Sequence, residues 1–282
     1  MIRSAAFLEA YSLFPHRAIN RASRVVARLP APAPVLRAAI DVWSRRAEID
    51  LADFEPGPFE SLEHFFLRRL APGARPLGEG LVAAVDGFVV GEGAIDAGTI
   101  LQVKGHPISV DQLVNGPPAP HRVAPTSLAA FEGGRYLTTF LRPSGYHYVH
   151  APEGARVERV RWIPGRFFPQ NEDALREIPR IYLRNERAVL ELTLADGTPL
   201  LLVMVGASVV GGIHVRGVDD EVLRRARVPA PVGRAVEKGE ELGHFTFGST
   251  VVLLAPRGLV ERFAVTEGQR IDMGRALTVA PS

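Results

Sequence analysis

The sequence predicts an α+β protein in which N-terminal amphipathic helices precede a mostly antiparallel β core domain. Two observations lead to this fold class. Apolar residues recur with helical spacing in the N-terminal part of the chain, whereas short β-branched runs separated by Gly, Pro, Asn or Asp dominate after about residue 80. With 46% hydrophobic and 23% charged residues, the composition is that of a globular protein, which excludes a disordered chain. No run approaches the roughly 18 apolar residues of a membrane-spanning helix.

The first fifty residues carry the basic excess of the chain, with eight arginines against four acidic residues. Four arginines recur at helical spacing and share one helical face: Arg17, Arg21, Arg24 and Arg28. The opposite face carries four apolar residues: Ile19, Ala22, Val26 and Leu29. One interpretation is a helical cap packed on the domain, with the arginines in water. The other is an interfacial anchor, with the apolar face in lipid and the arginines on anionic headgroups. Nucleic acid is not expected as a partner, because aromatic residues do not interleave with the basic stripe.

Two more helices are expected before the β-rich part. After a Pro-rich break at residues 30–34, the helical pattern returns with four residues: Leu36, Ile40, Trp43 and Ala47. Residues 61–70 form another amphipathic stretch, with Ser61 as a candidate N-cap. Pro72 and Gly73 follow it, and this pair is a strong helix breaker.

The β core is predicted from short runs with turn residues between them, such as the Asp196-Gly197 turn. This spacing is typical of an antiparallel domain with little helix. The runs are Gly87–Val90, Tyr136–Leu141, Val157–Ile163, Ala188–Leu194, Leu200–Val205, Val209–Val215 and Val251–Leu254.

Several kinds of site are excluded at once. The chain has no cysteine, so disulfides, thiolate zinc sites and a cysteine nucleophile are absent. It also has no Gly-rich phosphate loop. His147 and His150 have an i, i+3 spacing that could suit a metal, but no third ligand lies nearby in the sequence. We therefore expect no metal.

Two short motifs could carry chemistry. Asp86 precedes a glycine at the start of a β-like run, where an ordinary turn aspartate is the commoner case. Gly248 and Ser249 stand at the start of another run, where glycine permits backbone conformations that other residues resist. Asp86, one histidine of the pair and Ser249 are the ingredients of an acid–base–nucleophile triad. Spacing alone cannot assemble them.

The sequence resembles the phosphatidylserine decarboxylase family, which consists of self-cleaving, pyruvoyl-dependent enzymes. The resemblance rests on collinear motifs between about residues 59 and 255. They are Phe59–Pro76, Val85-Asp86-Gly87, Ile100–Gly105, Leu137–Pro152 with its two histidines, Pro164-Gly165, Phe168-Pro-Gln-Asn171, Arg184-Asn-Glu-Arg187, Val205-Gly-Ala207, Lys238–Gly243 and Phe247–Leu254.

The resemblance implies a role for each candidate residue. Ser249, activated by the base His150 that Asp86 orients, attacks the carbonyl of Gly248 in its own chain. The resulting ester is eliminated, and a pyruvoyl group remains at the new N-terminus of residues 249–282. This group forms a Schiff base with the substrate amine and accepts electrons as carbon dioxide leaves. His147 is the candidate for promoting decarboxylation or reprotonation. The alternative for His147 is a buried structural histidine.

The resemblance also implies the partners and the location. The substrate is phosphatidylserine in the bilayer, at the cytoplasmic side of the inner cell membrane, and the enzyme binds the anionic surface peripherally. We expect a helical membrane-associating segment over residues 1–58 and a β-rich catalytic domain over residues 59–282, cleaved between 248 and 249. A homodimer is one option for the assembly. Two other classes stay open, a serine hydrolase on a β scaffold and a non-catalytic membrane-binding module.

Overall fold

A computed structural model describes residues 25–102, 105–118, 124–170, 178–207, 212–246 and 249–278. Most of the predicted basic helix lies outside these residues, including Arg17, Arg21, Arg24, Ile19 and Ala22. Gly248 also lies outside them, whereas Ser249 is described.

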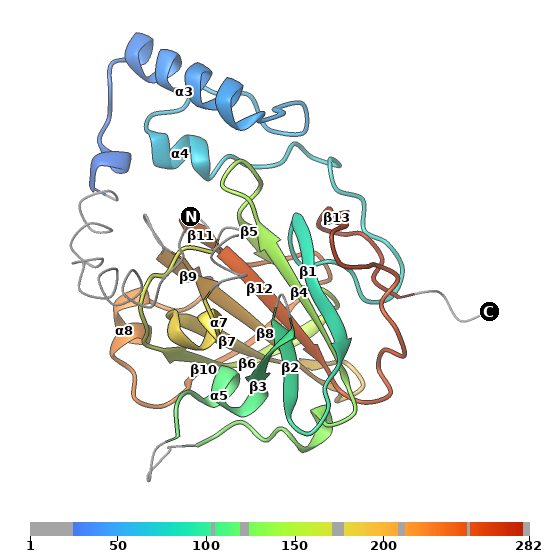
Figure 1. Cartoon of the computed structure of the whole chain (residues 1–282). Helices are drawn as coiled ribbons and strands as arrows, with labels where there is room; N and C mark the ends of the chain where they lie inside the picture. The colour runs from blue at the N-terminus through green and yellow to red at the C-terminus, as the bar shows by residue number, and fades with distance from the viewer. Residues whose placement is uncertain are drawn as a thin grey trace.

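An eight-stranded sheet in the order β10-β6-β7-β8-β12-β4-β1-β13 forms the centre of the fold (Figure 1). All of its strand pairs are antiparallel, as predicted. The strands are β1 (Gly87–Ala94), β4 (Arg135–Leu141), β6 (Ala155–Ile163), β7 (Arg187–Leu194), β8 (Pro199–Gly206), β10 (Ala230–Val236), β12 (Ser249–Ala255) and β13 (Arg270–Ile271).

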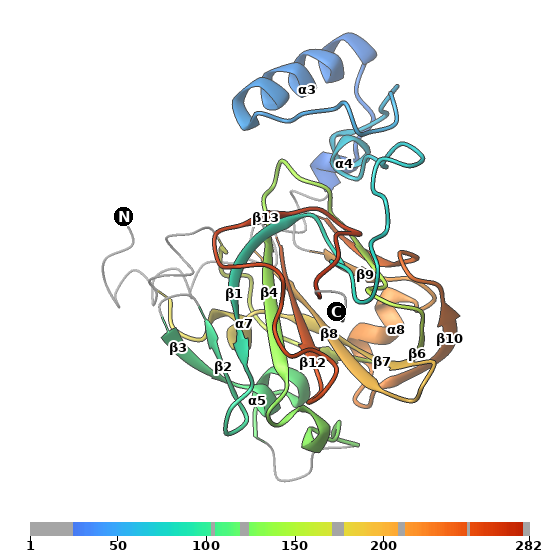
Figure 2. The same cartoon turned by 90° about the vertical axis from the view of Figure 1, so that its right-hand side faces the viewer.

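Smaller elements cover the two faces of this sheet (Figure 2). A three-stranded sheet in the order β5-β11-β9 lies on one side and a β2–β3 hairpin on the other. These strands are β2 (Thr99–Gln102), β3 (His106–Ser109), β5 (Tyr148–His150), β9 (Gly212–Val215) and β11 (Glu241–Thr246). The helices are α3 (Ala33–Ala47), α4 (Leu62–Phe66), α5 (Val110–Asn115), α7 (Ile181–Arg184) and α8 (Asp220–Arg225), with a 3-10 turn at Ala129–Phe131.

Two apolar cores result, one on each face of the eight-stranded sheet. The first core fills the space between the two sheets, where Val251 and Leu253 of β12 meet Val149 of β5 and Phe245 of β11. The second core lies under the hairpin, α5 and α7, and contains Val252 of β12. Since side chains alternate along a strand, odd-numbered residues of β12 point into the first core and even-numbered ones into the second.

The predicted α+β class is confirmed, and each of the seven predicted strands corresponds to an observed one. The sequence patterns missed β2, β3, β5, β10, β11 and β13. β5 and β13 are only three and two residues long, so they contain too few positions for an alternating pattern to be recognised.

The N-terminal helices lie together at one end of the sheets (Figure 1). Leu36 and Ile40 of α3 pack against Phe65 of α4, and the Oγ of Ser61 accepts a hydrogen bond from the backbone N–H of His64, which confirms the predicted N-cap. The helix predicted over residues 61–70 is too long, however, and ends at Phe66. The residues that follow adopt an extended conformation and form backbone hydrogen bonds with residues 53–55, which ends the helix.

Candidate active site

The strand register gathers the four candidate residues at one end of the main sheet. Ser249, the first residue of β12, is the partner of Leu141, the last residue of β4. Phe88 of β1 and Thr250 of β12 are both partners of Phe140, so the starts of β1 and β12 flank the end of β4, about 10 Å apart at two interstrand spacings. Asp86 therefore lies at this end. Both histidines follow β4 through a short loop, at or directly before β5, and lie at the same end; β5 lies beneath α4 (Figure 1).

Ser249 is fully buried, with 0% of its surface exposed. The alternation of β12 points its side chain into the first core, on the same side as Val251 and Leu253. Its hydroxyl has no hydrogen-bond partner among the residues that the structure describes. A buried hydroxyl without a partner is destabilising and therefore calls for an explanation.

His147 is also 0% exposed. Its Nδ1 lies 3.0 Å from the carbonyl oxygen of Gly145. Because a carbonyl only accepts hydrogen bonds, Nδ1 carries the proton and Nε2 holds the lone pair. Nε2 is buried and has no partner within the described part of the chain. Burial lowers the pKa of His147 to about 3, and the nearby charge of Arg68 acts in the same direction. His147 is thus a neutral base with a free lone pair.

Arg68 holds the loop that carries His147. Its guanidinium is buried and donates to the carbonyls of Phe65, Ser144 and Gly145, and it lies 4.4 Å from the ring centre of Phe54. Burial lowers the pKa of Arg68 to about 10, which keeps it charged at neutral pH. Nothing in the sequence singled out Arg68, although it lies within the Phe59–Pro76 motif.

An aromatic stack connects His147 to the N-terminal helices. The Phe66 ring of α4 lies 4.1 Å from the His147 ring, centre to centre. Phe66 also stacks on Trp43 of α3 at 6.2 Å, centre to centre, and an interplanar angle of 14°. Phe66 therefore covers His147, and α3 holds Phe66 in place.

His150 takes partners other than those expected. Its Nδ1–H donates to the carbonyl oxygen of Gly239 at 2.8 Å, so Nε2 accepts from the hydroxyl of Tyr146 at 2.9 Å. Burial lowers the pKa of His150, and the negative charges of Glu241 and Asp86 oppose this shift. Tyr146 lies within the double-histidine motif, but nothing in its spacing indicated this contact.

Asp86 is buried and bound on two sides. Its carboxylate accepts hydrogen bonds from the guanidinium of Arg75, at 2.7 Å from Nη2, and from the backbone N–H of Met273 at 2.7 Å. The hydrogen bonds of Asp86 and those of His150 thus go to different partners, and Asp86 acts on His150 through its charge. That Asp86 orients His150 stays a prediction.

The side chains of the two histidines point to opposite faces of β5. His147 alternates with Val149 and Ala151, which belong to the first core, whereas His150 lies on the other face of β5 with Tyr148. An i, i+3 pair shares a face on a helix but not on a strand. The described residues contain no group of three or more His, Asp or Glu side chains that could hold a metal ion.

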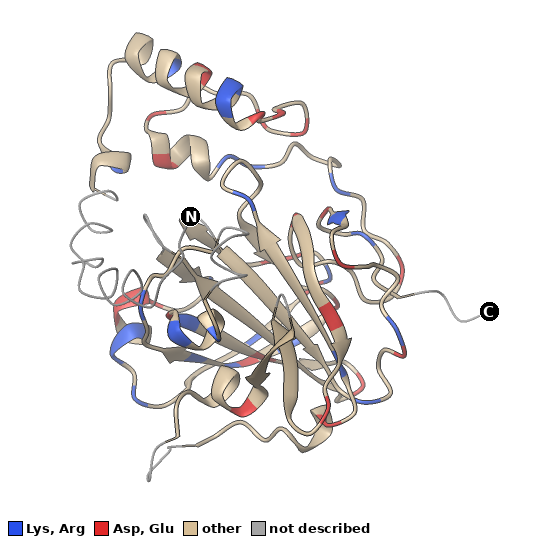
Figure 3. Cartoon of the chain, viewed as in Figure 1, with Lys and Arg blue, Asp and Glu red and all other residues tan. Residues whose placement is uncertain are grey.

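The described N-terminal segment exposes apolar side chains to solvent. The exposed fractions of Val26 and Leu29 are 63% and 56%, and Val25, Val35 and Val42 are also exposed. In contrast, the apolar face of α3 packs inward against α4. Basic residues lie in the last turn of α3 (Figure 3). No helix among the described residues is long and apolar enough to cross a membrane.

Arg28 is the described member of the predicted arginine stripe. Its guanidinium donates to the carboxylate of Glu63 in α4, at 2.7 and 2.9 Å. This ion pair connects the N-terminal turn to α4, so Arg28 serves the packed-cap interpretation. A cavity of about 320 Å³ lies between residues 55–59 and the α4 region, with Arg68, Arg69 and Tyr148 also in its wall.

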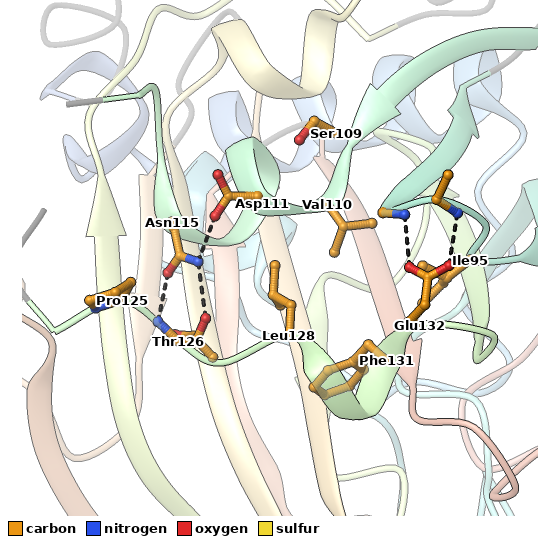
Figure 4. Close-up of a pocket in the computed structure, with 12 residues that line it drawn as sticks. Ile95, Ser109, Val110, Asp111, Asn115, Pro125, Thr126, Leu128, Phe131 and Glu132 are labelled. Carbon is orange, nitrogen blue, oxygen red and sulfur yellow. Dashed lines mark hydrogen bonds between the residues drawn. The ribbon is translucent and has the colours of Figure 1, made fainter. Parts of the chain in front are cut away.

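A larger cavity, of about 600 Å³, lies at the opposite end of β4 (Figure 4). β4 is seven residues long, which separates the two ends by about 20 Å. The polar groups in this cavity bind one another: Glu132 accepts from the backbone N–H groups of Ala97 and Gly98, and Asn115 bonds to Asp111. This cavity is separate from the cluster around Ser249.

The chain is similar in sequence to known proteins. Residues 62–279 match the family model described as "Phosphatidylserine decarboxylase". The chain is 37% identical over 290 residues to the phosphatidylserine decarboxylase proenzyme of Anaeromyxobacter sp. (strain K), covering 96% of this chain and 97% of the relative. It is 33% identical to the proenzyme of Myxococcus xanthus (strain DK1622), covering 97% and 98%, and 32% identical to that of Pseudomonas putida (strain GB-1), covering 98% of both.

Proposed function

This chain belongs to the phosphatidylserine decarboxylase family of carboxy-lyases, and from that premise we propose that it is a proenzyme that cuts itself between Gly248 and Ser249. The cut leaves a large subunit ending at Gly248 and a small subunit of residues 249–282 with a pyruvoyl group at its N-terminus. The observation that carries this proposal is the placement of Ser249. Its hydroxyl is buried at the first residue of a central strand and makes no hydrogen bond to a described residue. No such bond therefore competes with attack of the hydroxyl on the carbonyl of Gly248.

The cleavage uses atoms of the chain alone until its last step. The Oγ of Ser249 attacks the carbonyl carbon of Gly248, the peptide C–N bond breaks, and the nitrogen takes a proton. Removal of the α-proton of residue 249 then expels the Gly248 carboxylate and leaves dehydroalanine, from which water releases ammonia to give the pyruvoyl group. A dry site favours this route, since water would hydrolyse the ester and restore serine. The full burial of Ser249 supports such a site.

We assign the proton transfers of maturation to His150, with Asp86 in support. His150 is neutral with its lone pair on Nε2, which is the form a general base needs. The charge of Asp86 favours the protonated form that results when His150 takes the serine proton. Tyr146 occupies Nε2 in the structure, and His150 lies on the face of β5 opposite the first core into which Ser249 points, so this hydrogen bond has to be released or has to relay the proton.

We assign turnover to His147, which lies at the same end of the main sheet as residue 249. A pyruvoyl group there supplies an electron sink for the loss of carbon dioxide from an α-amino acid headgroup. By the alternation of side chains with Val251 and with Val149, Ser249 and His147 both point toward the first core, and the lone pair on Nε2 of His147 can exchange a proton. Since Phe66 covers His147, phosphatidylserine reaches it only if Phe66 moves.

The lipid substrate gives the exposed apolar residues a function. We propose that Val25, Val26 and Leu29 contact the bilayer and that the enzyme binds there peripherally. Arg28 is engaged by Glu63, so the anionic surface is recognised by other basic residues of this segment, such as Arg45 and Arg46. The cavity beside Arg69, lined by residues 55–59 and the α4 region, offers the headgroup a place to bind.

Intact-mass measurement of the purified protein tests the proposal. We expect two chains that divide at residue 248, with the smaller one carrying a reactive keto group, and a single uncut chain for Ser249→Ala. A wild-type chain that stays uncut while it decarboxylates phosphatidylserine would refute the mechanism. An uncut chain whose Ser249 reacts with a fluorophosphonate would indicate a serine hydrolase instead.

A further inference from the structure

Residues from three motifs that have no assigned role in self-cleavage lie close together next to Ser249. Gln170 comes from the motif at residues 168–171, Asn185 from residues 184–187 and Gly206 from residues 205–207. Gly206 is the strand partner of Ser249 on β8, so these motifs meet at the residue beside the cleavage point.

A buried chain of hydrogen bonds connects them to Thr250. The hydroxyl of Thr250 donates to Oε1 of Gln170 at 2.6 Å, and Nε2 of Gln170 donates to the carbonyl of Gly206 at 2.8 Å. Nδ2 of Asn185 donates to the same carbonyl at 2.9 Å. Asn185 is itself held by both backbone groups of Phe168, at 2.8 and 2.9 Å. Gln170 is 3% exposed, and Asn185 and Thr250 are 0% exposed.

This network lies on the face of β12 opposite Ser249. Thr250 is even-numbered and points toward the second core, whereas the Ser249 side chain points into the first core. The Thr250 hydroxyl therefore fixes β12 from the face opposite Ser249. Each of these bonds is costly to break, because a buried polar group that is left without a partner destabilises the folded protein.

Cleavage changes what holds residue 249 in place. Before the cut, the covalent chain continues from β11 into β12. After it, residue 249 is a chain end, and chain ends fray unless other contacts hold them. The remaining constraints are the β12 ladders to β4 and β8 and the hydrogen bond of the Thr250 side chain to Gln170.

We propose that Gln170, Asn185 and Thr250 form a clamp that holds the new N-terminus of the small subunit in its strand position after self-cleavage. The inference rests on the proposed function. Gln170 and Asn185 are positioning residues in this view, because they act on residue 249 through Thr250 and Gly206. The clamp serves turnover, which needs a fixed chain end, and not the cut itself, during which the chain is continuous.

Thr250→Val tests the clamp, since it keeps the shape and removes the hydroxyl. We expect complete self-cleavage, about tenfold faster amide hydrogen exchange at residues 250–252 of the cleaved enzyme, and a kcat lowered about tenfold with little change in KM. In the uncut Ser249→Ala background, Thr250→Val should leave exchange at these residues close to that of Ser249→Ala alone. Thr250→Ser keeps the hydroxyl and should restore both properties.

Two further variants complete the test. Gln170→Met removes the other side of the same bond and should reproduce the effect of Thr250→Val. Thr138→Val is the matched control, because Thr138 is a buried threonine of the neighbouring strand β4 whose hydroxyl has no partner among the described residues. We expect it to behave as wild type.

Several outcomes would overturn the clamp. They are unchanged exchange and kcat in both Thr250→Val and Gln170→Met, exchange raised equally in the uncut protein, or loss of self-cleavage in either variant. A wild-type chain that never cleaves would instead refute the proposed function, so the two failures are distinguishable.

Discussion

The hydroxyl of Tyr146 lies 2.9 Å from Nε2 of His150, the atom that a general base would use. Because Nδ1 of His150 donates to the Gly239 carbonyl, Tyr146 donates to the lone pair of Nε2. A hydrogen bond to the neutral form of a base disfavours its protonation. Tyr146 therefore acts in the same direction as burial, which lowers the pKa of His150.

Replacement of Tyr146 by Phe should move the pH dependence of self-cleavage. The ring that stacks on His150 remains, but the donor to Nε2 is lost, so the pKa of His150 rises. A base must be unprotonated to act, and the acid limb of the cleavage rate should shift to higher pH. The measurement is the rate of cleavage of freshly synthesised chain between pH 5 and 8. An identical limb in both proteins would show that Tyr146 has left His150 before the reaction.

Alanine variants should separate maturation from turnover. We expect Asp86→Ala and His150→Ala to stay uncut, because loss of a triad member or its support typically reduces the rate by orders of magnitude. His147→Ala should cut but decarboxylate poorly, since it loses the proton-exchanging lone pair of Nε2. A denaturing gel and a carbon dioxide assay distinguish these cases. If His147→Ala failed to cut while His150→Ala matured normally, the two roles would be exchanged.

Burial of His147 should make the folded chain sensitive to acid. The pKa of His147 is about 3 in the folded state, against about 6.5 in an unfolded chain. The stability it contributes is fully present above pH 6.5 and is lost as pH falls toward 3, because only the unfolded state takes the proton. In uncut Ser249→Ala protein, this group should lower the free energy of unfolding by about 2 kcal/mol between pH 6.5 and 5.

Denaturant unfolding at the two pH values measures this loss. His147→Gln in the same background cannot take the proton and should lose less stability by about that amount, although His150 contributes in the same direction in both proteins. Equal losses would mean that His147 is protonated in the folded protein.

Polar substitutions of the exposed apolar residues should weaken membrane binding alone. We expect Val26→Gln combined with Leu29→Gln to reduce co-sedimentation with phosphatidylserine-containing vesicles several-fold, while self-cleavage proceeds, because neither side chain is buried in the fold. Val222→Gln combined with Val228→Gln is the matched control, since these exposed valines belong to the α8 region and not to the N-terminal segment. Equal binding by both double variants would show that the N-terminal segment is only a packed cap.

Removal of residues 1–50 is a less specific version of this experiment. It should weaken vesicle binding and activity on bilayer substrate, as the sequence predicts. In the structure, however, it also removes Trp43 from Phe66 and the Leu36–Ile40 face from Phe65. A loss of activity after truncation therefore combines lost membrane contact with a disturbed cover over His147.

The core strands were predictable, because a buried strand consists of a continuous run of apolar, often β-branched residues. Such a run can be recognised in the sequence alone. Val251–Leu254 is such a run, and β12 extends it by only a few residues. The end of α4 was not predictable in this way. Residues 67–70 continue the helical pattern, but hydrogen bonds of residues 69–71 with residues 53–55 draw them into an extended conformation. Contacts with a distant segment overrode local preference there.

The sequence by itself determined the fold class, the position of Ser249 at the start of a strand and the four residues that the family motifs select. These features depend on spacing along the chain or on short motifs. Only the tertiary structure decided which partner each polar group takes: Arg75 for Asp86, Tyr146 for His150 and Gln170 for Thr250. A hydrogen bond requires its two atoms to approach within about 3 Å, and for Gln170 and Thr250 the fold achieves this across 80 residues. No local pattern records such a contact, because it forms only when the strands have been placed side by side.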